Sequence, residues 1–390
     1  MRYFVLKMLF LGVVICLNFI STAQNNFLLK GKIFDSETNS PIPFANIYIV
    51  STSLGVISGE DGFFAFYIPE NNRLDTLCIS ALGYEQFKIV CKDFKDNNDY
   101  KLLPKTYPLA EVVVVAISAQ DILKKAKKNF KINYSSKPFI LTGDFQEYIR
   151  EDSNFVRAFE ASVNLIENNS FNLDDESFSI DSVSLSANMI KEDNLKLLLK
   201  DQILSNYFDF GVFLNYFSID TDAKYTIESI IQNGNDKTYV IKCVGEVYES
   251  IYHINSSDYA VTQHYTTQTK PAINSSETKD VWRDYLENTR KLTFRKYGLY
   301  YYPVYFYNYL TLQQHKGKDN SIPLYTYTSI TQMLVTSVEI NVEIVKEKKV
   351  RKEYKDVYFS KTSIRNIWKN YNSLPNSEVR NNALKQLGVK

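Results

Sequence analysis

The sequence predicts a mainly β protein, in which an N-terminal β-sandwich precedes an α+β domain with a large antiparallel sheet packed on one or two helices. The 390-residue chain contains 29 Tyr and 25 Phe but only 13 Gly, and tyrosine favours half-exposed pleated strands. Short apolar segments separated by turn residues fill residues 29–116. Longer alternating segments follow, without the regular alternation of strands and helices that is typical of a parallel sheet.

The N-terminus has the pattern of an export signal. A basic start, Met1–Lys7, precedes the apolar run Met8–Ile20 and the small residues Ser21–Ala23. The run is shorter than the roughly 20 residues that a membrane-spanning helix needs. We therefore expect a signal peptide over residues 1–23 and a mature chain that begins near Gln24, with an uncleaved anchor as the alternative.

Residues 24–103 form the predicted sandwich. The segment Ala45–Val50 alternates apolar and polar residues, as a half-buried strand does. The turn Gly59–Gly62 supplies two glycines, which adopt the positive φ angles of tight hairpins at little cost. Its acidic residues could suggest calcium, but the ligand pattern of an EF-hand is absent and a turn carboxylate commonly bonds its own backbone.

Several motifs of this segment resemble a carboxypeptidase regulatory-like domain. They are Gly31-x-Ile33-x-Asp35, Pro41-Ile42-Pro43-x-Ala45-Asn46-Ile47, Gly59-x-Asp61-Gly62-x-Phe64 and Leu82-Gly83-Tyr84. The segment Pro108-Leu109-Ala110-Glu111-Val112-Val113-Val114 is similar to the end of this module in TonB-dependent receptors of the Bacteroidetes. The resemblance covers residues 28–116 and implies an Ig/transthyretin-like sandwich without peptidase activity of its own.

The chain lacks the common catalytic motifs. Its three histidines, His253, His264 and His315, do not have the spacing of a zinc peptidase, and neither a Gly-x-Ser-x-Gly elbow nor a phosphate-binding glycine loop occurs. We therefore expect no catalytic residues, no cofactor and no metal, and a protein that is not an enzyme. A glycosidase pair among the many carboxylates stays open. The net charge of +1 gives no general attraction to nucleic acid.

A second domain is predicted over residues 118–390, after a linker at 104–117. Ser118 and Asp121 suggest a capping box for a helix in which Ile122, Leu123, Ala126 and Phe130 recur at helical spacing. A further helix is expected at Asn194–Tyr207 and a short one at Ser377–Leu387. Paired strands are expected at Phe139–Tyr148 and Phe155–Val163, with a meander after them.

One part of this meander resembles, faintly, the half-barrel of lipoprotein carriers of the LolA/RseB type. The resemblance lies in Tyr239-Val240-Ile241-x-Cys243, Gly245-x-Val247-Tyr248, Tyr252-x-Ile254 and Asp258-Tyr259-Ala260-Val261. It implies a curved antiparallel sheet that wraps a helix and can shelter an acyl chain.

The tyrosine run from Tyr297 to Tyr309 contains the candidate ligand site. A period of two places Tyr301, Tyr305, Tyr307 and Tyr309 on one face of a strand. Rigid aromatic rings make good contact surfaces for sugars or acyl chains. The alternative is cross-strand aromatic packing that stabilises a wide sheet.

Two further features leave alternatives open. Removal of the signal leaves Cys78, Cys91 and Cys243, which are buried thiols or, for Cys78 and Cys91, a bridge. The basic run Lys346–Lys352 suggests a solvated hairpin tip or a site for lipopolysaccharide phosphates.

Together these features favour an exported, non-catalytic protein of the periplasm or outer membrane. Its sandwich would dock or stabilise, and its sheet domain would bind an envelope protein, a glycan or a lipid-like ligand. The alternatives are a carrier or sensor of a lipid-like ligand and, with least support, an enzyme that acts on glycans or peptides.

Overall fold

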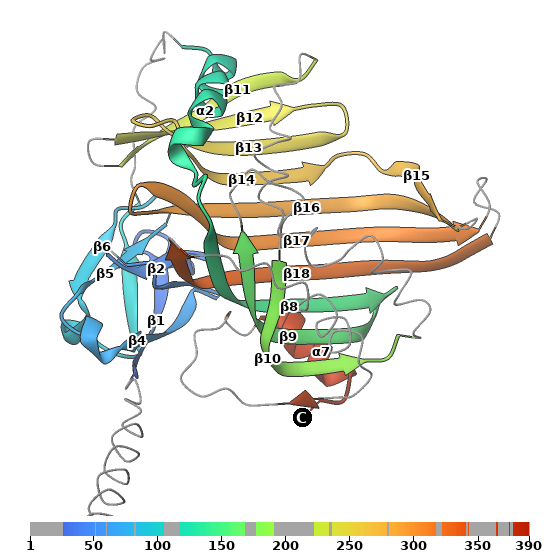
Figure 1. Cartoon of the computed structure of the whole chain (residues 1–390), viewed down its shortest axis with the longest axis horizontal. Helices are drawn as coiled ribbons and strands as arrows, with labels where there is room; N and C mark the ends of the chain where they lie inside the picture. The colour runs from blue at the N-terminus through green and yellow to red at the C-terminus, as the bar shows by residue number, and fades with distance from the viewer. Residues whose placement is uncertain are drawn as a thin grey trace, which may run out of the picture.

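The computed structural model describes residues 26–50, 52–59, 61–81, 83–104, 117–167, 177–190, 222–233, 236–278, 281–316, 322–340, 342, 364–365, 374 and 377–389. The mainly β prediction is confirmed, with an N-terminal sheet-rich domain beside a large antiparallel sheet (Figure 1). The predicted signal peptide, the predicted helix at 194–207 and the basic run at 346–352 lie outside the described residues, as does most of the predicted linker.

The N-terminal domain is a two-sheet sandwich. Seven of the described strands build it, in the orders β4-β1-β7 and β3-β2-β5-β6. All neighbours are antiparallel except β1 and β7, which are parallel. The strands are β1 (Asn26–Asp35), β2 (Asn46–Ile49), β3 (Gly55–Ile57), β4 (Phe63–Pro69), β5 (Thr76–Ser80), β6 (Phe87–Val90) and β7 (Asn98–Leu102), with short 3-10 helices at Glu70–Asn72 and Cys91–Asp93.

Alternation along these strands builds the core of the sandwich. Ile33, Phe64 and Phe66 are wholly buried between the two sheets. Gly62 has a φ of 76°, and a Cβ there would overlap the carbonyl oxygen of Ile33, so the turn requires glycine. The Asp61 carboxylate accepts the backbone N–H of Phe63 at 3.0 Å, as expected for a turn carboxylate.

The large sheet contains 12 of the described strands. Its order is β11-β12-β13-β14-β16-β17-β18-β8-β9-β10-β19, and β15 pairs with β16. Pairing of β18 with β8 joins the last long strand to the first. The strands are β8 (Phe139–Glu151), β9 (Asn154–Glu167), β10 (Ser177–Asn188), β11 (Lys224–Asn233), β12 (Asp236–Val244), β13 (Tyr248–Asn255), β14 (Val261–Gln268), β15 (Ala272–Thr278), β16 (Val281–Tyr297), β17 (Tyr300–Lys316), β18 (Ile322–Ile340) and β19 (Ile364–Arg365).

Helix α2 (Ala119–Asn133) covers one face of this sheet. Ser118 caps it as predicted, since the Ser118 hydroxyl oxygen accepts the N–H of Asp121 at 3.1 Å. Its residues Ile122, Leu123 and Ala126 are buried in the main core, together with Phe145 of β8. These apolar side chains pack between the helix and the sheet.

The opposite face carries helix α7 (Glu378–Gln386) and the N-terminal domain. Ser377 caps α7, which contacts β8 and β9. The N-terminal domain lies beside one end of β16, β17 and β18 (Figure 1), where Tyr305 and Leu334 of the sheet join its core. This docking of the sandwich on the sheet is what forms the cleft described next.

Cys78, Cys91 and Cys243 form no disulfide bond with one another, and burial raises the pKa of Cys91 to about 11. None of the helices in the described residues is long and apolar enough to cross a membrane.

Candidate functional site

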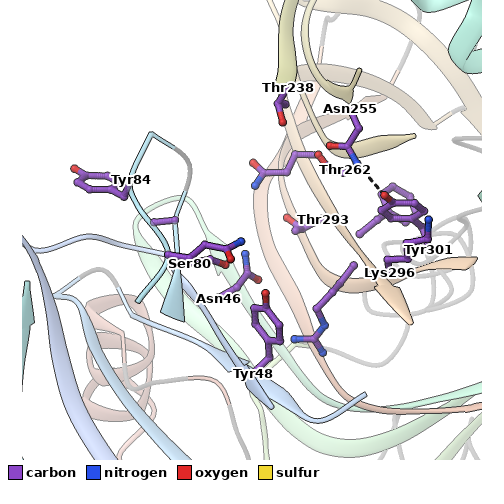
Figure 2. Close-up of a pocket in the computed structure, with 15 residues that line it drawn as sticks. Asn46, Tyr48, Ser80, Tyr84, Thr238, Asn255, Thr262, Thr293, Lys296 and Tyr301 are labelled. Atoms are coloured by element: carbon purple, nitrogen blue, oxygen red, sulfur yellow. Dashed lines mark hydrogen bonds between the residues drawn. The ribbon is translucent and has the colours of Figure 1, made fainter. Parts of the chain in front are cut away.

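A cleft lined mainly by polar residues lies between the N-terminal domain and the large sheet. It has a volume of about 360 Å³. Figure 2 shows Asn46, Tyr48 and Ser80 of the sandwich on one side, with Thr293 and Thr262 of the sheet across from them. The N-terminal domain and the large sheet therefore both contribute residues to this one site. The described lining contains no Asp or Glu.

A second cavity of about 310 Å³ adjoins this cleft. The two share Asn46, Ala81, Tyr84 and Gln263 in their walls. The second adds Lys291 and Phe44. Together the two cavities form an elongated groove along the boundary between the domains, which we call the interdomain groove.

Strand β16 supplies the cationic wall of the groove. Successive side chains of a strand point to opposite faces. Leu292 and Phe294 are buried in the main core, whereas Lys291, Thr293 and Arg295 line the groove from the alternate positions, and Phe294 also contributes to the wall of the cleft. One short segment thus contributes to both the core and the groove.

Arg295 connects the two domains. Its Nη2 donates a hydrogen bond of 2.8 Å to the carbonyl oxygen of Ser53, and its guanidinium lies 5.0 Å from the ring centroid of Tyr48. Burial lowers the pKa of Arg295 to about 10, so the side chain keeps its charge at neutral pH.

Lys291 is partly buried against an aromatic ring. Its Nζ lies 4.6 Å from the ring centroid of Phe44, and burial lowers the pKa of the ammonium. Tyr305 stacks on the same phenylalanine, with ring centroids 6.0 Å apart. Within the described residues, neither Lys291 nor Arg295 has a carboxylate within ion-pair distance.

The third cation of the groove is already paired. Lys296 contacts Asp258 at 3.3 Å, and the Tyr301 hydroxyl donates to the same carboxylate at 2.9 Å. Asn255 donates to the Tyr301 hydroxyl at 2.8 Å (Figure 2). Burial raises the pKa of Tyr301, so it is a neutral phenol in the groove wall.

The structure does not bring the four tyrosines of the predicted platform onto one face. A register shift between β16 and β17 falls at Val304, so Tyr301 packs with the main core whereas Tyr305 and Tyr307 pack against the N-terminal domain. Tyr309 accepts a hydrogen bond of 3.3 Å from Arg150. Tyr301 alone of the four lines the cleft. A ligand role for these residues stays a prediction.

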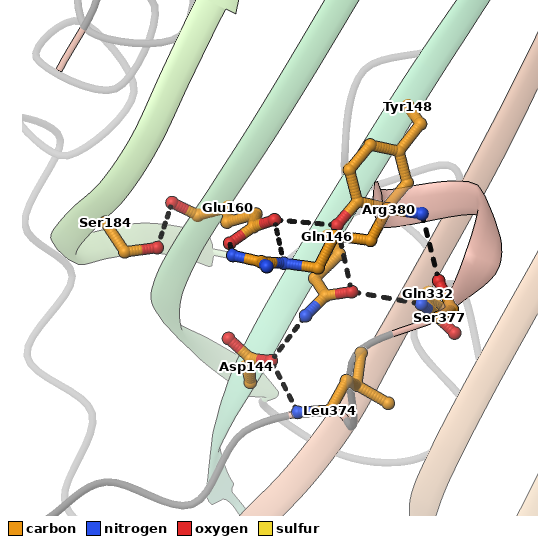
Figure 3. Close-up of polar contacts among 9 residues, drawn as sticks. All are labelled: Asp144, Gln146, Tyr148, Glu160, Ser184, Gln332, Leu374, Ser377 and Arg380. Atoms are coloured by element: carbon orange, nitrogen blue, oxygen red, sulfur yellow. Dashed lines mark hydrogen bonds and ion pairs between the residues drawn. The ribbon is translucent and has the colours of Figure 1, made fainter. Parts of the chain in front are cut away.

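A second polar cluster lies under α7. Figure 3 shows Arg380 of α7 bonded to Glu160 of β9, at 2.7 and 3.0 Å. Tyr148 donates to Glu160 at 2.7 Å, and the backbone N–H of Leu374 donates to Asp144 at 2.8 Å. Burial raises the pKa of Asp144 to about 8. Because these groups are buried and satisfy one another, the cluster holds α7 and Leu374 on the sheet.

The described histidines do not form a metal site. His253 and His264 lie on neighbouring strands β13 and β14, and burial lowers their pKa values to about 4 and 3. His315 contacts Asp284 at 3.3 Å. No group of three potential metal ligands occurs in the described part of the chain.

Sequence reasoning missed Lys291 and Arg295 as candidate site residues. The signal was present in Lys291-Leu292-Thr293-Phe294-Arg295, where cationic and hydroxyl residues alternate with apolar ones. Only the docked sandwich turns the exposed face of this strand into a groove.

Comparisons with known proteins agree with the sequence resemblance at the N-terminus. Residues 29–114 match the family model of the CarboxypepD_reg-like domain. No curated protein matches the chain. Similar solved structures include a LolA superfamily protein from Nitrosomonas europaea, with 12% identity over 61% of this chain and 99% of that one and a TM-score of 0.22. Another is a domain described as an outer membrane lipoprotein-sorting protein from Vibrio parahaemolyticus, with 8% identity over 62% and 100% and a TM-score of 0.27.

Proposed function

We propose that this chain is an exported cell-envelope protein that binds a polar ligand in the interdomain groove and has no catalytic activity of its own. We propose the division into a signal peptide at 1–23, a sandwich at 24–103, a linker at 104–117 and a sheet domain at 118–390. The N-terminal sequence supports export, and the family match at residues 29–114 supports a docking or stabilising role for the sandwich.

The observation that carries this proposal is the shared wall of the groove. Hydroxyl and amide groups face it from both domains, including Asn46, Ser80, Thr293 and Gln263. A concave site with several convergent polar groups is the usual form of a small-molecule site. A ligand that contacts both walls would also stabilise the docked arrangement.

Two alternatives have less support. A lipid carrier needs an apolar space between helix and sheet, whereas Ile122, Leu123 and Ala126 of α2 are buried in the main core there. A glycosidase needs two carboxyl groups roughly 5–10 Å apart in its cleft. Among the described residues that line the groove, none supplies a carboxylate.

Native mass spectrometry of the full chain, recovered from the envelope of the cell that makes it, tests this proposal. We expect a mature chain that begins near Gln24 and carries a bound molecule. Ala81→Trp fills the wall common to both cavities and should abolish the bound mass. Leu103→Trp, at an exposed position of the same domain, should retain it.

Three outcomes would contradict the proposal. One is recovery of the intact chain from the cytoplasm. Another is a wild-type chain without any bound molecule. The third is a bound lipid that survives Ala81→Trp, which would favour the carrier.

A further inference from the structure

We infer that the ligand of the interdomain groove is an oligosaccharide with anionic groups, carboxylate or phosphate, which Lys291 and Arg295 bind. This inference rests on the proposed binding function and specifies its ligand class. The charge of the groove, its shape and the chemistry of its walls each support it.

The positive charges of Lys291 and Arg295 favour an anionic ligand in the groove. Lys291 is partly buried, as is Arg295, and their contacts are with the rings of Phe44 and Tyr48 and the carbonyl oxygen of Ser53. Taking a cation out of water is costly unless an opposite charge or several hydrogen bonds replace the water. Since neither side chain has a carboxylate partner among the described residues, an anionic ligand would supply the missing charge.

Arg295 also has more N–H donors than it uses in the hydrogen bond with Ser53. A guanidinium has five N–H donors in a planar fork that matches carboxylate and phosphate oxygens. One of them is used on Ser53. The side chain lines the cleft, so a ligand bound there would lie beside this guanidinium.

The spacing of the two cations favours an elongated ligand. Lys291 and Arg295 are four residues apart on β16, which corresponds to roughly 13 Å along a strand. Lys291 lines one cavity and Arg295 the other, and the cavities share a wall. A ligand that contacts both cations must therefore extend along the groove, as an oligosaccharide of several rings does.

The rest of the lining suits sugar rings. Thr262, Thr293 and Ser80 contribute hydroxyls, and Asn46 and Gln263 contribute amides. These groups can donate to and accept from sugar hydroxyls. Tyr48 and Tyr84 add aromatic surface on the side of the sandwich.

Isothermal titration calorimetry on the full mature chain tests the inference with three probes. They are tetragalacturonate, a phosphorylated maltotetraose and neutral maltotetraose. We expect at least one anionic probe to bind, more weakly as salt increases, and the neutral probe to bind far more weakly. Lys291→Gln should weaken anionic binding about tenfold, the effect of one charge-assisted hydrogen bond. Lys291→Arg should retain binding.

The matched control is Lys128→Gln, which removes the same charge from the exposed face of α2. It should bind like the wild type. Equal binding of maltotetraose and both anionic probes, with no effect of Lys291→Gln, would overturn the anionic ligand and leave the proposed binding function intact. Absence of binding by both anionic probes would also overturn the inference, and the native mass measurement would then decide the proposed function separately.

Discussion

Gly55 of the sandwich leaves the space that the guanidinium of Arg295 occupies, because a Cβ at Gly55 would overlap Arg295 Nη1. The glycine therefore matters for docking of the two domains as well as for β3 itself. Its absence of a side chain lets Arg295 reach both Ser53 and the ring of Tyr48.

Gly55→Ala should displace Arg295 and weaken docking of the sandwich. The hydrogen bond and the ring contact together are worth about 2 kcal/mol. Hydrogen exchange should become faster at the boundary, in β3 and the adjoining part of β18. Gly245→Ala, in a turn of the large sheet far along the chain, is the control and should leave this exchange unchanged. Equal exchange in both variants would show that Arg295 does not hold the domains together.

Removal of one partner from the buried ion pair between Glu147 and Arg157 should strongly destabilise the fold. Both side chains are fully buried, and Arg157 Nε lies 2.8 Å from the Glu147 carboxylate. Arg157→Met removes this partner from a buried charge and should lower the free energy of unfolding by about 3–5 kcal/mol. Combined Glu147→Leu and Arg157→Met should recover much of that loss in urea unfolding. A double variant no more stable than the single one would argue against this account.

The contact of Arg380 with Glu160 should contribute more stability than an exposed ion pair. Arg380→Met is expected to cost about 2–3 kcal/mol in urea unfolding, since Glu160 is buried and would lose both of these hydrogen bonds. Arg73→Met removes the half-exposed pair with Glu70 and should cost about 0–1 kcal/mol. Losses of the same size would show that α7 is not held by this pair.

Asp144 should make the protein less stable as pH rises. Its pKa is raised from 3.8 to about 8 by burial, so between these values the folded chain holds a proton that the unfolded chain has released. Stability is therefore greatest at the acid end of this window and falls as pH rises towards about 8, by at most about 1.4 kcal/mol per pH unit. Unfolding free energies measured from pH 6.5 upward should show this slope.

Asp144→Asn is the matched variant and should flatten that slope. His253 and His264 change the free energy of unfolding in the opposite direction with pH, and over a lower pH range. His253 and His264 have lowered pKa values of about 4 and 3, so their contribution is present above 6.5 and is lost as pH falls. A slope above pH 6.5 that persists in Asp144→Asn would assign it to another group.

Local patterns predicted much of the fold. Ser118 and Asp121 fixed the start of α2, and the turn between β8 and β9 gave their antiparallel pairing. The ligand role of the four tyrosines stays a prediction, but alternation alone could not show that Tyr301 packs on a different side from Tyr305 and Tyr307. The shift at Val304 changes which side of the sheet the next residues reach, and such a shift depends on pairing with β16.

The groove could not be predicted because it arises from tertiary docking. Lys291 and Arg295 alone describe an ordinary solvated strand face. Phe44 and Tyr48, about 250 residues earlier in the chain, turn that face into a wall by packing on it. Because residues so far apart in the chain form the site, patterns among neighbouring residues cannot predict it.

The cluster under α7 has a consequence for the order of events during synthesis. Asp144 and Glu160 enter the nascent chain more than 200 residues before Leu374 and Arg380, their partners in the finished sheet. Until those partners are translated, two carboxylates on this face must stay in contact with water. We therefore expect this face of β8 and β9 to be buried late, after the segment that carries Leu374 and Arg380 has been made.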